Sequence, residues 1–205
     1  MKKGNLIVIS GPSGAGKSSV VSKAMEARDD ICFSTSVTTR SPRPGEVDGV
    51  DYFFIDQSRF DEMVADNELL EHAVYVSNSY GTPRKFVEDQ ISNGMNVILD
   101  IEIQGAAQVR KNKPEAIMIF IIPPSLEELK RRLTGRGTET DAAIDARLRR
   151  AVLECREADF YDYLIVNDDL TKASEELRSI INAELCRFEK NKEILISFGK
   201  NHSLT

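Results

Sequence analysis

The segment that most constrains the fold of this chain is Gly11-Pro12-Ser13-Gly14-Ala15-Gly16-Lys17-Ser18, which fits G-x-x-x-x-G-K-[ST] at every fixed position. The apolar run Leu6–Ile9 precedes it and the helical pattern Ser18–Ala27 follows, so the strand–loop–helix context is also met. Glycines allow the backbone to curl until successive N–H groups face an anion, and a helix N-terminus adds partial positive charge. We therefore expect a nucleoside triphosphate site, with Lys17 reaching the β- and γ-phosphates and Ser18 holding Mg²⁺.

Four short runs rich in Ile and Val predict strands that are buried on both faces, as in a parallel sheet. These runs are Leu6–Ile9, Asn96–Leu99, Ile117–Ile122 and Tyr163–Val166. Helical patterns separate them, including Leu126–Leu133, where Ser125 and Glu128 predict a capping box, and a further pattern over residues 170–185. This alternation predicts an α/β fold with a parallel sheet flanked by helices.

Two stretches interrupt the alternation of strands and helices. Residues 35–85 carry turn signals and short aromatic segments, which predict an inserted lobe of mixed α/β structure. Residues 134–158 are strongly charged, with Gly135 and Gly137 as candidate hinges, and indicate either a mobile helical flap or a solvated surface helix. The residues after Glu189 give no structural assignment, and we expect them to fray.

The composition argues against several classes of protein. Acidic residues number 33 against 27 Lys and Arg, a net charge of −6, which argues against a surface that wraps nucleic acid. The only histidines, His72 and His202, are too few for a His-rich zinc site and argue against triad chemistry. Cys32, Cys155 and Cys186 form no C-x-x-C motif and are odd in number, which argues against a disulfide framework. No window approaches the ~20 apolar residues of a membrane span, so we expect a reduced, cytoplasmic protein.

The phosphate-binding motif leaves two functions open: a nucleotide-operated switch or motor, and a kinase for a small acceptor. The sequence contains no N-K-x-D motif for a GTPase switch, and its length leaves little room for a motor's coupling domain. A kinase needs a second anion site, and Arg40 and Arg43 offer one, because Pro42 and Pro44 restrict the backbone around them. Hydroxyl side chains surround this pair, and Tyr52 follows soon after.

With these segments in view, the sequence resembles the guanylate kinases, which phosphorylate GMP with ATP. The matching segments follow the family order over residues 4–185: Gly11–Ser18, Ser36–Glu46, Asp51-Tyr52, Glu71, Tyr80-Gly81-Thr82, Leu99-Asp100-Ile101, Gln104-Gly105, Pro123-Pro124-Ser125, Gly135–Thr140, Arg147-Leu148 and Val166–Leu170. The resemblance implies conversion of ATP and GMP to ADP and GDP. Two alternatives remain: another nucleoside monophosphate as acceptor, and a guanylate kinase-like binding module that has lost catalysis.

The resemblance also implies a division of the chain. A guanylate kinase-like domain covers residues 4–185, with a P-loop NTPase core at 4–34, 86–125 and 159–188, a GMP-binding lobe at 35–85 and a lid at 126–158; residues 189–205 form a tail. The implied substrates are ATP and GMP in purine metabolism and the implied cofactor is Mg²⁺. No nucleic acid or membrane partner is expected, and a homo-oligomer is left open.

By resemblance, Arg40, Arg43, Tyr52 and Tyr80 hold the GMP phosphate, and the guanine site is lined by Ser36, Glu71, Thr82 and Asp100. The chemistry agrees, because a carboxylate such as Glu71 can accept from guanine N1–H and N2–H₂ while a hydroxyl of Ser36 or Thr82 donates to O6. Adenine offers the opposite pattern, so a discrimination of ~10⁴ is reasonable. Without the resemblance, Glu71 and Thr82 would be taken for ordinary surface residues.

The resemblance assigns Arg136 and Arg147 as lid arginines that close onto the transferring phosphate, with Arg132 as a further candidate. Together with Lys17 and Arg40, Arg136 and Arg147 form the expected catalytic set. Asn167 is expected near the adenine of ATP, and Asp100 either assists Mg²⁺ through water or simply closes its strand. No general base is needed, because the attacking phosphate monoester, with a second pKa of ~6, is already mostly anionic near neutrality.

Overall fold

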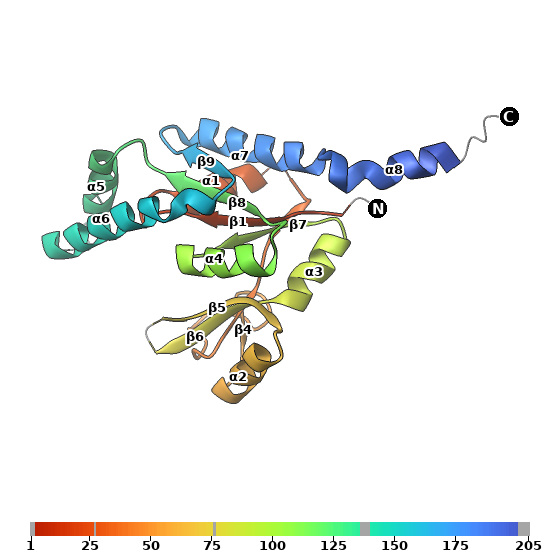
Figure 1. The fold of residues 1–205 in the computed structure, drawn as a ribbon. Helices are drawn as coiled ribbons and strands as arrows, with labels where there is room; N and C mark the ends of the chain where they lie inside the picture. The colour runs from red at the N-terminus through yellow and green to blue at the C-terminus, as the bar shows by residue number, and fades with distance from the viewer. Residues whose placement is uncertain (1–2, 27, 76, 136–139, 201–205) are drawn as a thin grey trace.

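The computed structural model describes residues 3–26, 28–75, 77–135 and 140–200 (Figure 1). Its central sheet has five parallel strands in the order β2-β7-β1-β8-β9. Their bounds are β1 (Leu6–Ser10), β2 (Ile31–Phe33), β7 (Asn96–Asp100), β8 (Ile117–Ile122) and β9 (Tyr163–Val166). The predicted α/β class is confirmed, and all four predicted runs form strands, while the three-residue β2 was not predicted.

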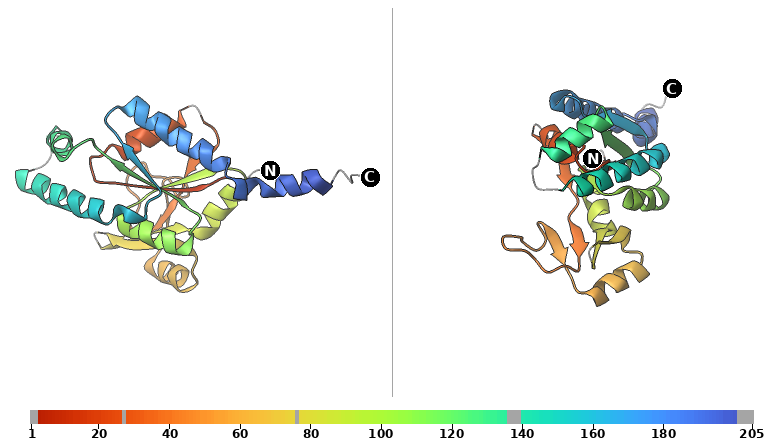
Figure 2. Two further views of the ribbon diagram at one scale, coloured as in Figure 1. Left: turned by 45° about the horizontal axis from the view of Figure 1, so that its top comes forward. Right: turned by 90° about the vertical axis from the view of Figure 1, so that its left-hand side faces the viewer.

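Helices cover both faces of this sheet (Figure 2): α1 (Lys17–Met25) and α7 (Leu170–Leu185) on one, α3 (Arg84–Ser92) and α4 (Ile103–Asn112) on the other. All five residues of β1 are buried, because this strand lies at the centre of the sheet. Alternate side chains of a strand point to opposite faces. Ile7 and Ile9 therefore pack in the α1–α7 core, and Leu6 and Val8 pack in the α3–α4 core.

The prediction that Tyr163–Val166 is buried on both faces is wrong. Only Ile165 is buried, whereas the side chains of Leu164 and Val166 are 61% and 43% exposed. β9 is an edge strand, paired only with β8 in this sheet, and α7 covers the face to which Ile165 points. An apolar run therefore identified a strand here without identifying its position in the sheet.

A second, smaller sheet has four strands in the order β4-β3-β6-β5. The strands are β3 (Ser36–Thr38), β4 (Tyr52–Phe54), β5 (Leu69–Tyr75) and β6 (Asn78–Pro83), and α2 (Gln57–Ala65) packs beside them. β3 runs parallel to β4 and antiparallel to β6, and β5 runs antiparallel to β6. A separate apolar cluster that includes Val37, Phe60 and Leu69 supports this sheet, which lies beneath the main body in Figure 1 and in the right-hand view of Figure 2.

Helix α4 joins the small sheet to the main body. The Gln108 side chain exchanges two hydrogen bonds with the backbone of His72 in β5: its Oε1 accepts at 3.1 Å and its Nε2 donates at 3.0 Å. One turn further along, Asn112 Nδ2 donates to the Leu70 carbonyl at 2.8 Å. The amide side chains of α4 thus bond to β5 as a neighbouring strand would.

Helices α5 (Leu126–Thr134) and α6 (Asp141–Arg156) pack on each other through an apolar cluster that includes Leu129, Leu133 and Ile144. Ser125 caps α5, since its Oγ accepts from the Glu128 N–H at 3.1 Å. The Glu128 carboxylate, predicted to complete a capping box, instead accepts from the guanidinium groups of Arg131 and Arg132. A short 3₁₀ turn, Ala158–Phe160, follows α6 and leads into β9.

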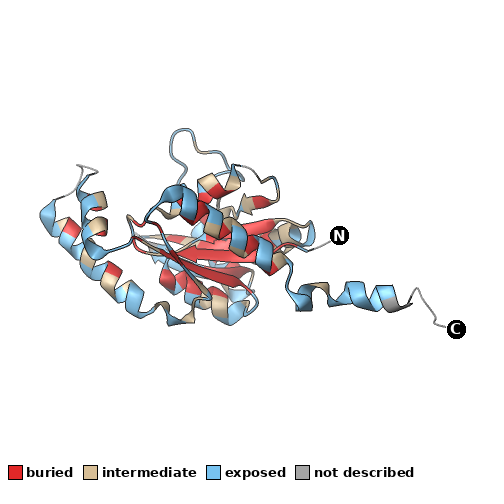
Figure 3. Ribbon diagram, turned by 90° about the horizontal axis from the view of Figure 1, so that it is seen from above, coloured by how far each residue is buried: buried red, intermediate tan, exposed pale blue. Residues whose placement is uncertain are grey.

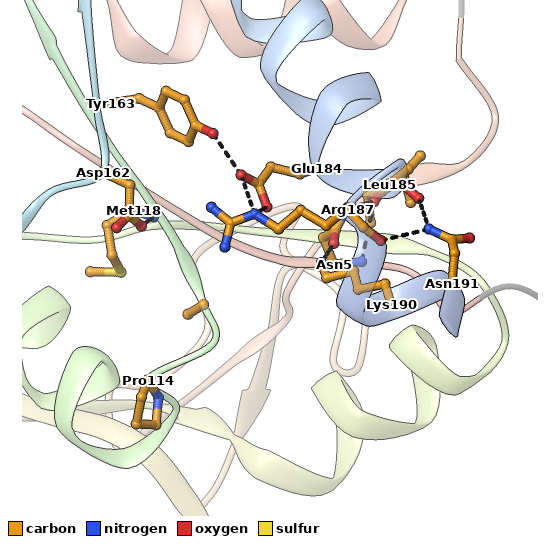
Figure 4. A network of polar contacts seen from close by, with 12 residues as sticks. Asn5, Pro114, Met118, Asp162, Tyr163, Glu184, Leu185, Arg187, Lys190 and Asn191 are labelled. Carbon is orange, nitrogen blue, oxygen red and sulfur yellow. Dashed lines mark hydrogen bonds and ion pairs between the residues drawn. The ribbon is translucent and has the colours of Figure 1, made fainter. Parts of the chain in front are cut away.

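The expectation that the chain frays after Glu189 is wrong, because Phe188–Lys200 forms helix α8. This helix extends from the body and is largely exposed (Figure 3). Figure 4 shows how it is attached: the buried Glu184 carboxylate accepts from Tyr163 Oη at 2.6 Å and pairs with Arg187 at 2.9 Å, and Lys190 Nζ donates to Asn5 Oδ1. Among the helices described, none combines the length and the apolar character needed to cross a membrane.

Candidate active site

The loop Gly11–Ser18 connects the carboxyl end of β1 to α1. Gly14 and Gly16 have φ values of 95° and 85°, a region that residues with a Cβ atom rarely adopt. Space is also lacking: a Cβ on Gly14 would lie 2.9 Å from Leu133 Cδ2, and one on Gly16 would lie 2.4 Å from Asn167 Nδ2. The two glycines therefore let the loop curl and let α5 and Asn167 pack directly against it.

Three polar side chains gather at the end of this loop. Lys17 Nζ donates to the Gly11 carbonyl at 2.7 Å, and Ser18 Oγ lies 3.5 Å from Asp100 Oδ2 at the end of β7. Desolvation by the surrounding protein raises the pKa of Asp100, and the charge of Lys17 and the hydrogen bond from Ser18 oppose this shift. The hydroxyl and carboxylate oxygens of Ser18 and Asp100 are the kind of ligand that a hard divalent cation takes.

Helix α6 brings one of the predicted lid arginines to the loop. Arg147 Nη1 donates to Ser13 Oγ at 3.1 Å, although the two residues are 134 positions apart. The other predicted lid arginine, Arg136, lies outside the described residues. The structure therefore places Arg147 beside the phosphate-binding loop, whereas the assignment of Arg136 rests on the resemblance.

Arg132 and Asn167 both contact the loop at Ala15. Asn167 is buried, and its Nδ2 donates to the Ala15 carbonyl at 2.8 Å. Arg132 donates through Nη1 to the same carbonyl at 3.3 Å and through Nη2 to the Asn167 carbonyl at 2.8 Å. The side chain expected near the adenine thus bonds to the loop that would hold the phosphates.

A second group of predicted residues lies on the small sheet. The Arg40 guanidinium lies over the Tyr52 ring, 5.4 Å from its centroid, and the Tyr52 and Tyr80 rings meet edge to face at 6.1 Å. Ser36 is the register partner of Tyr52 in the parallel pair β3–β4. The strand pairing therefore collects one guanidinium, two phenols and a hydroxyl, all groups that can donate hydrogen bonds to phosphate or base oxygens.

Glu46 is a residue whose part in this group the sequence reasoning missed. Its carboxylate binds both terminal nitrogens of Arg40 at 2.8 and 2.9 Å and accepts from the Arg43 backbone N–H at 2.7 Å. Arg40 accordingly lowers the pKa of Glu46, and Glu46 raises that of Arg40. The Arg43 side chain itself is exposed. A carboxylate three positions after Arg43 and six after Arg40 was the available signal.

Glu71 and Thr82 are buried, so their sequence-only interpretation as surface residues is wrong. Glu71 is 7% exposed, its Oε1 accepts from Thr82 Oγ1 at 2.6 Å, and its Oε2 would lie 2.9 Å from a Cβ on Gly105. Burial raises the pKa of Glu71, and the Thr82 hydrogen bond opposes that shift. Because the Thr82 hydroxyl donates its hydrogen bond to Glu71, Ser36 is the hydroxyl left to donate to a base oxygen.

The two groups therefore combine a phosphate-binding loop at the carboxyl edge of a parallel sheet, where ligands of open α/β folds bind, with a surface on the appended sheet that can bind a base and an anion.

A cavity of about 940 Å³ lies elsewhere, at the amino end of β1 between α3 and α8. The residues predicted to bind nucleotides do not line it.

Comparison with known proteins gives consistent results along the chain. The family model described as guanylate kinase matches residues 3–184. The guanylate kinase of Bacillus subtilis is 50% identical over 191 residues, which cover 92% of this chain and 93% of that protein. The guanylate kinase of Oceanobacillus iheyensis is 48% identical over 189 residues, 92% of each chain.

Solved structures add the similarity in three dimensions. The crystal structure of guanylate kinase from Anaplasma phagocytophilum matches with a TM-score of 0.69 and 36% identity, over 91% of this chain and 89% of that one. The SH3-kinase fragment of tight junction protein 3 shares the fold with a TM-score of 0.50 at 11% identity, over 91% of this chain and 60% of that one.

Proposed function

The chain belongs to the guanylate kinase family and is an ATP:GMP phosphotransferase, and we propose that its phosphate-binding loop holds ATP while its small sheet holds GMP. The observation that carries this division is the occurrence, in one chain, of an intact loop Gly11–Ser18 and a buried carboxylate, Glu71, on a separate sheet. The first can bind phosphates of any nucleotide, whereas the second can read a base.

The ATP site consists of the loop residues Gly11, Pro12, Ser13, Gly14, Ala15, Gly16, Lys17 and Ser18, with Asn167 behind them. Backbone N–H groups of this loop bind the phosphates, and Lys17 moves from the Gly11 carbonyl to the β- and γ-phosphates. Ser18 and Asp100 fit Mg²⁺, which when bound offsets negative charge on the phosphate oxygens. The family resemblance also assigns Asp100 to the lining of the guanine site, and we include it there as part of the proposal.

The GMP phosphate is bound by Arg40, Arg43, Tyr52 and Tyr80. Arg40, just after β3, clusters with Tyr52 of β4 and Tyr80 of β6, the strands on either side of β3, and this supports the assignment. The Glu46 carboxylate supports it too, because it fixes the loop that carries both arginines. Two guanidinium groups offset the charge of a phosphate dianion, and the phenols add directional hydrogen bonds.

The guanine base is read by Glu71, which accepts from N1–H and N2–H₂, and by Ser36, which donates to O6. Thr82 holds the Glu71 carboxylate in place through its 2.6 Å hydrogen bond. Adenine lacks these donors and would leave the buried carboxylate uncompensated, which is why GMP is preferred.

Catalysis rests on positioning and on positive charge. Lys17, Arg40, Arg136 and Arg147 supply that charge around the transferring phosphoryl group, and the attacking phosphate oxygen of GMP is already ionised. The contact of Arg147 with Ser13 supports its assignment, because it places a guanidinium at the loop. The reaction supplies GDP to purine nucleotide metabolism.

The test of this proposal replaces Lys17 with Met and uses Lys23→Met, a lysine of the same helix α1, as its control. We expect Lys17→Met to lower kcat/KM for ATP and GMP roughly 10²–10³-fold, since it removes one preorganised charge from the site. Lys23→Met should stay within about twofold. The wild-type protein should turn over GMP much faster than AMP or UMP. Faster turnover of AMP than of GMP, or full activity of Lys17→Met, would refute the assignment.

A further inference from the structure

One carbonyl group of the phosphate-binding loop is held from outside by two side chains. The Ala15 carbonyl accepts from Asn167 Nδ2 at 2.8 Å and from Arg132 Nη1 at 3.3 Å. Arg132 is itself fixed at its other nitrogens, by Glu128 Oε1 at 2.7 Å and by the Asn167 carbonyl at 2.8 Å. We refer to Arg132 and Asn167, with their bonds to Ala15, as the loop brace.

The brace determines the direction of the next N–H group. In a trans peptide, the C=O of Ala15 and the N–H of Gly16 point to opposite sides of the chain. With the carbonyl held on the outer side by the brace, the Gly16 N–H faces the inside of the loop. The carbonyl of Gly16 is held in turn by the Val20 N–H at 3.1 Å, at the start of α1. Both sides of Gly16 are therefore fixed.

Glycine makes such a restraint necessary. Gly16 has φ 85° and ψ 22°, and its freedom of rotation is the reason it can adopt this conformation. The same freedom lets the Ala15–Gly16 peptide turn over when nothing holds it, and the loop would then present a carbonyl oxygen to the phosphates. Replacing a donor by an oxygen in an anion site reverses the sign of the local interaction.

We propose that Arg132 and Asn167 are positioning residues for the triphosphate, which hold the Ala15–Gly16 peptide so that its N–H faces the phosphates. This proposal rests on the proposed ATP site. It assigns Arg132 a different part from that of a lid arginine, because its three nitrogens are bonded within the protein. It also gives the buried Asn167 side chain a task that requires no contact with the adenine.

The neighbouring Arg131 provides a matched control. Both arginines pair with the Glu128 carboxylate, Arg131 through Nε at 2.7 Å and Arg132 through Nε at 2.7 Å. Arg132 alone of the two extends to the loop; its side chain is 22% exposed, against 75% for Arg131. Replacing each by Met removes the same charge from the same helix, and only one replacement removes the brace.

Binding of inorganic tripolyphosphate, measured by calorimetry in the presence of Mg²⁺, tests the proposal without a base and without GMP. We expect Arg132→Met to weaken tripolyphosphate and ATP binding by the same factor, roughly tenfold, while Arg131→Met stays within about twofold. Arg132→Lys keeps the charge but cannot reach three acceptors, so its loss should approach that of Met. Affinity for GMP should change little in all three variants.

Three results would overturn the proposal. Unchanged tripolyphosphate affinity in Arg132→Met together with weaker ATP binding would mean that Arg132 touches the base. Unchanged affinity for both, with a lower kcat, would mean that Arg132 acts on the transferring phosphoryl group as a lid arginine does. A wild-type protein that fails to bind tripolyphosphate would also refute it, whereas the GMP turnover assay tests the proposed function independently.

A second variant tests whether Arg132 and Asn167 act on the same carbonyl group, that of Ala15. Asn167→Leu removes the other donor at similar volume, and because both side chains hold one carbonyl, the double variant should lose less than the product of the two single losses. The amide signal of Gly16 in nuclear magnetic resonance spectra should shift in Arg132→Met and Asn167→Leu and stay in place in Arg131→Met. Independent, multiplicative losses or an unmoved Gly16 signal would contradict the brace.

Discussion

The buried carboxylate of Glu71, which we propose reads the guanine base, opposes the stability of the fold that carries it. It lies between the small sheet and α4, with the Thr82 hydroxyl on one oxygen and Gly105 beside the other. Burial raises its pKa, so ionised Glu71 is less favourable in the folded protein than in the unfolded chain. The donors of a guanine base would compensate this charge.

We predict that Glu71→Gln stabilises the protein in the absence of nucleotide and weakens GMP binding. Because the folded pKa is raised, the folded protein keeps this proton to higher pH, and wild-type stability declines as pH rises from the ordinary value near 4.5 through the folded pKa. Gln removes that decline. Thermal unfolding between pH 4 and pH 8 should show an advantage of Glu71→Gln that is largest at pH 8.

In the same variant, GMP affinity should fall roughly ten- to hundredfold, the range for losing hydrogen bonds to a charged group, with ADP affinity unchanged. Glu62→Gln serves as the control, since Glu62 is an exposed residue of α2 that pairs with Arg59. An advantage that grows toward pH 4 would contradict the burial argument.

Much of the site could be predicted at the level of residues, for reasons that differ between its two halves. Gly11–Ser18 is contiguous, so its chemistry is visible in the sequence. Glu71 and Thr82 come from two strands, and only their pairing explains why a polar residue is buried. The contacts of Arg132 and Asn167 with Ala15 join residues 117 and 152 positions apart, and no local pattern indicates them.

At the level of elements, α4 has two partners on opposite sides. Its apolar residues Ala106 and Val109 pack in the core beneath β1, while Gln108 and Asn112 bond to the backbone of β5. Apolar periodicity can indicate the first contact in advance. The second depends on amide side chains, which a sequence reader assigns to the solvent, so this junction between sheets was not predicted.

We predict that Gln108→Ala lowers the free energy of unfolding by about 1–2 kcal/mol, because it removes two hydrogen bonds from the His72 backbone. Gln104→Ala, at an exposed position of the same helix, should change it by less than about 0.5 kcal/mol. Urea denaturation measures both values. Hydrogen exchange at the His72 amide should accelerate in Gln108→Ala alone, and equal effects of the two variants would argue against this junction.

The same limit explains the elements that were misjudged. β9 has an apolar sequence, yet its place at the edge of the sheet leaves Leu164 and Val166 exposed. Helix α8 had no assignment from its sequence, and most of its large apolar side chains are exposed in the structure rather than packed in a core. In both cases the sequence indicates the affinity of the side chains for apolar surroundings, and the remainder of the fold decides whether such surroundings exist.

Over the whole molecule, the proposed ATP-binding loop and the attachment of α8 lie at opposite ends of β1. The phosphate-binding loop follows the carboxyl end of β1, whereas α8 is attached beside Asn5, at the amino end of that strand. The family model, which ends at residue 184, also stops before α8.

We predict that ending the chain after Arg187 leaves kcat/KM for GMP within about twofold of the full-length value, since α8 contributes no residue to the proposed sites. Ending it after Asp168 should instead abolish folding, because it removes the buried side chains of Ala173, Leu177 and Ile181. Steady-state kinetics and circular dichroism distinguish these outcomes. A tenfold loss of kcat/KM in the chain that ends after Arg187 would show that α8 affects the reaction.

The attachment of α8 beside Asn5 has a practical consequence. The described chain begins near the amino end of β1, and α8 extends away from the body from that same end, opposite the phosphate-binding loop (Figure 1). A linker to a glass surface or a fluorescent tag can therefore be joined to either end while the opposite side stays open to diffusing nucleotides. Immobilised single molecules could then be watched through repeated turnovers.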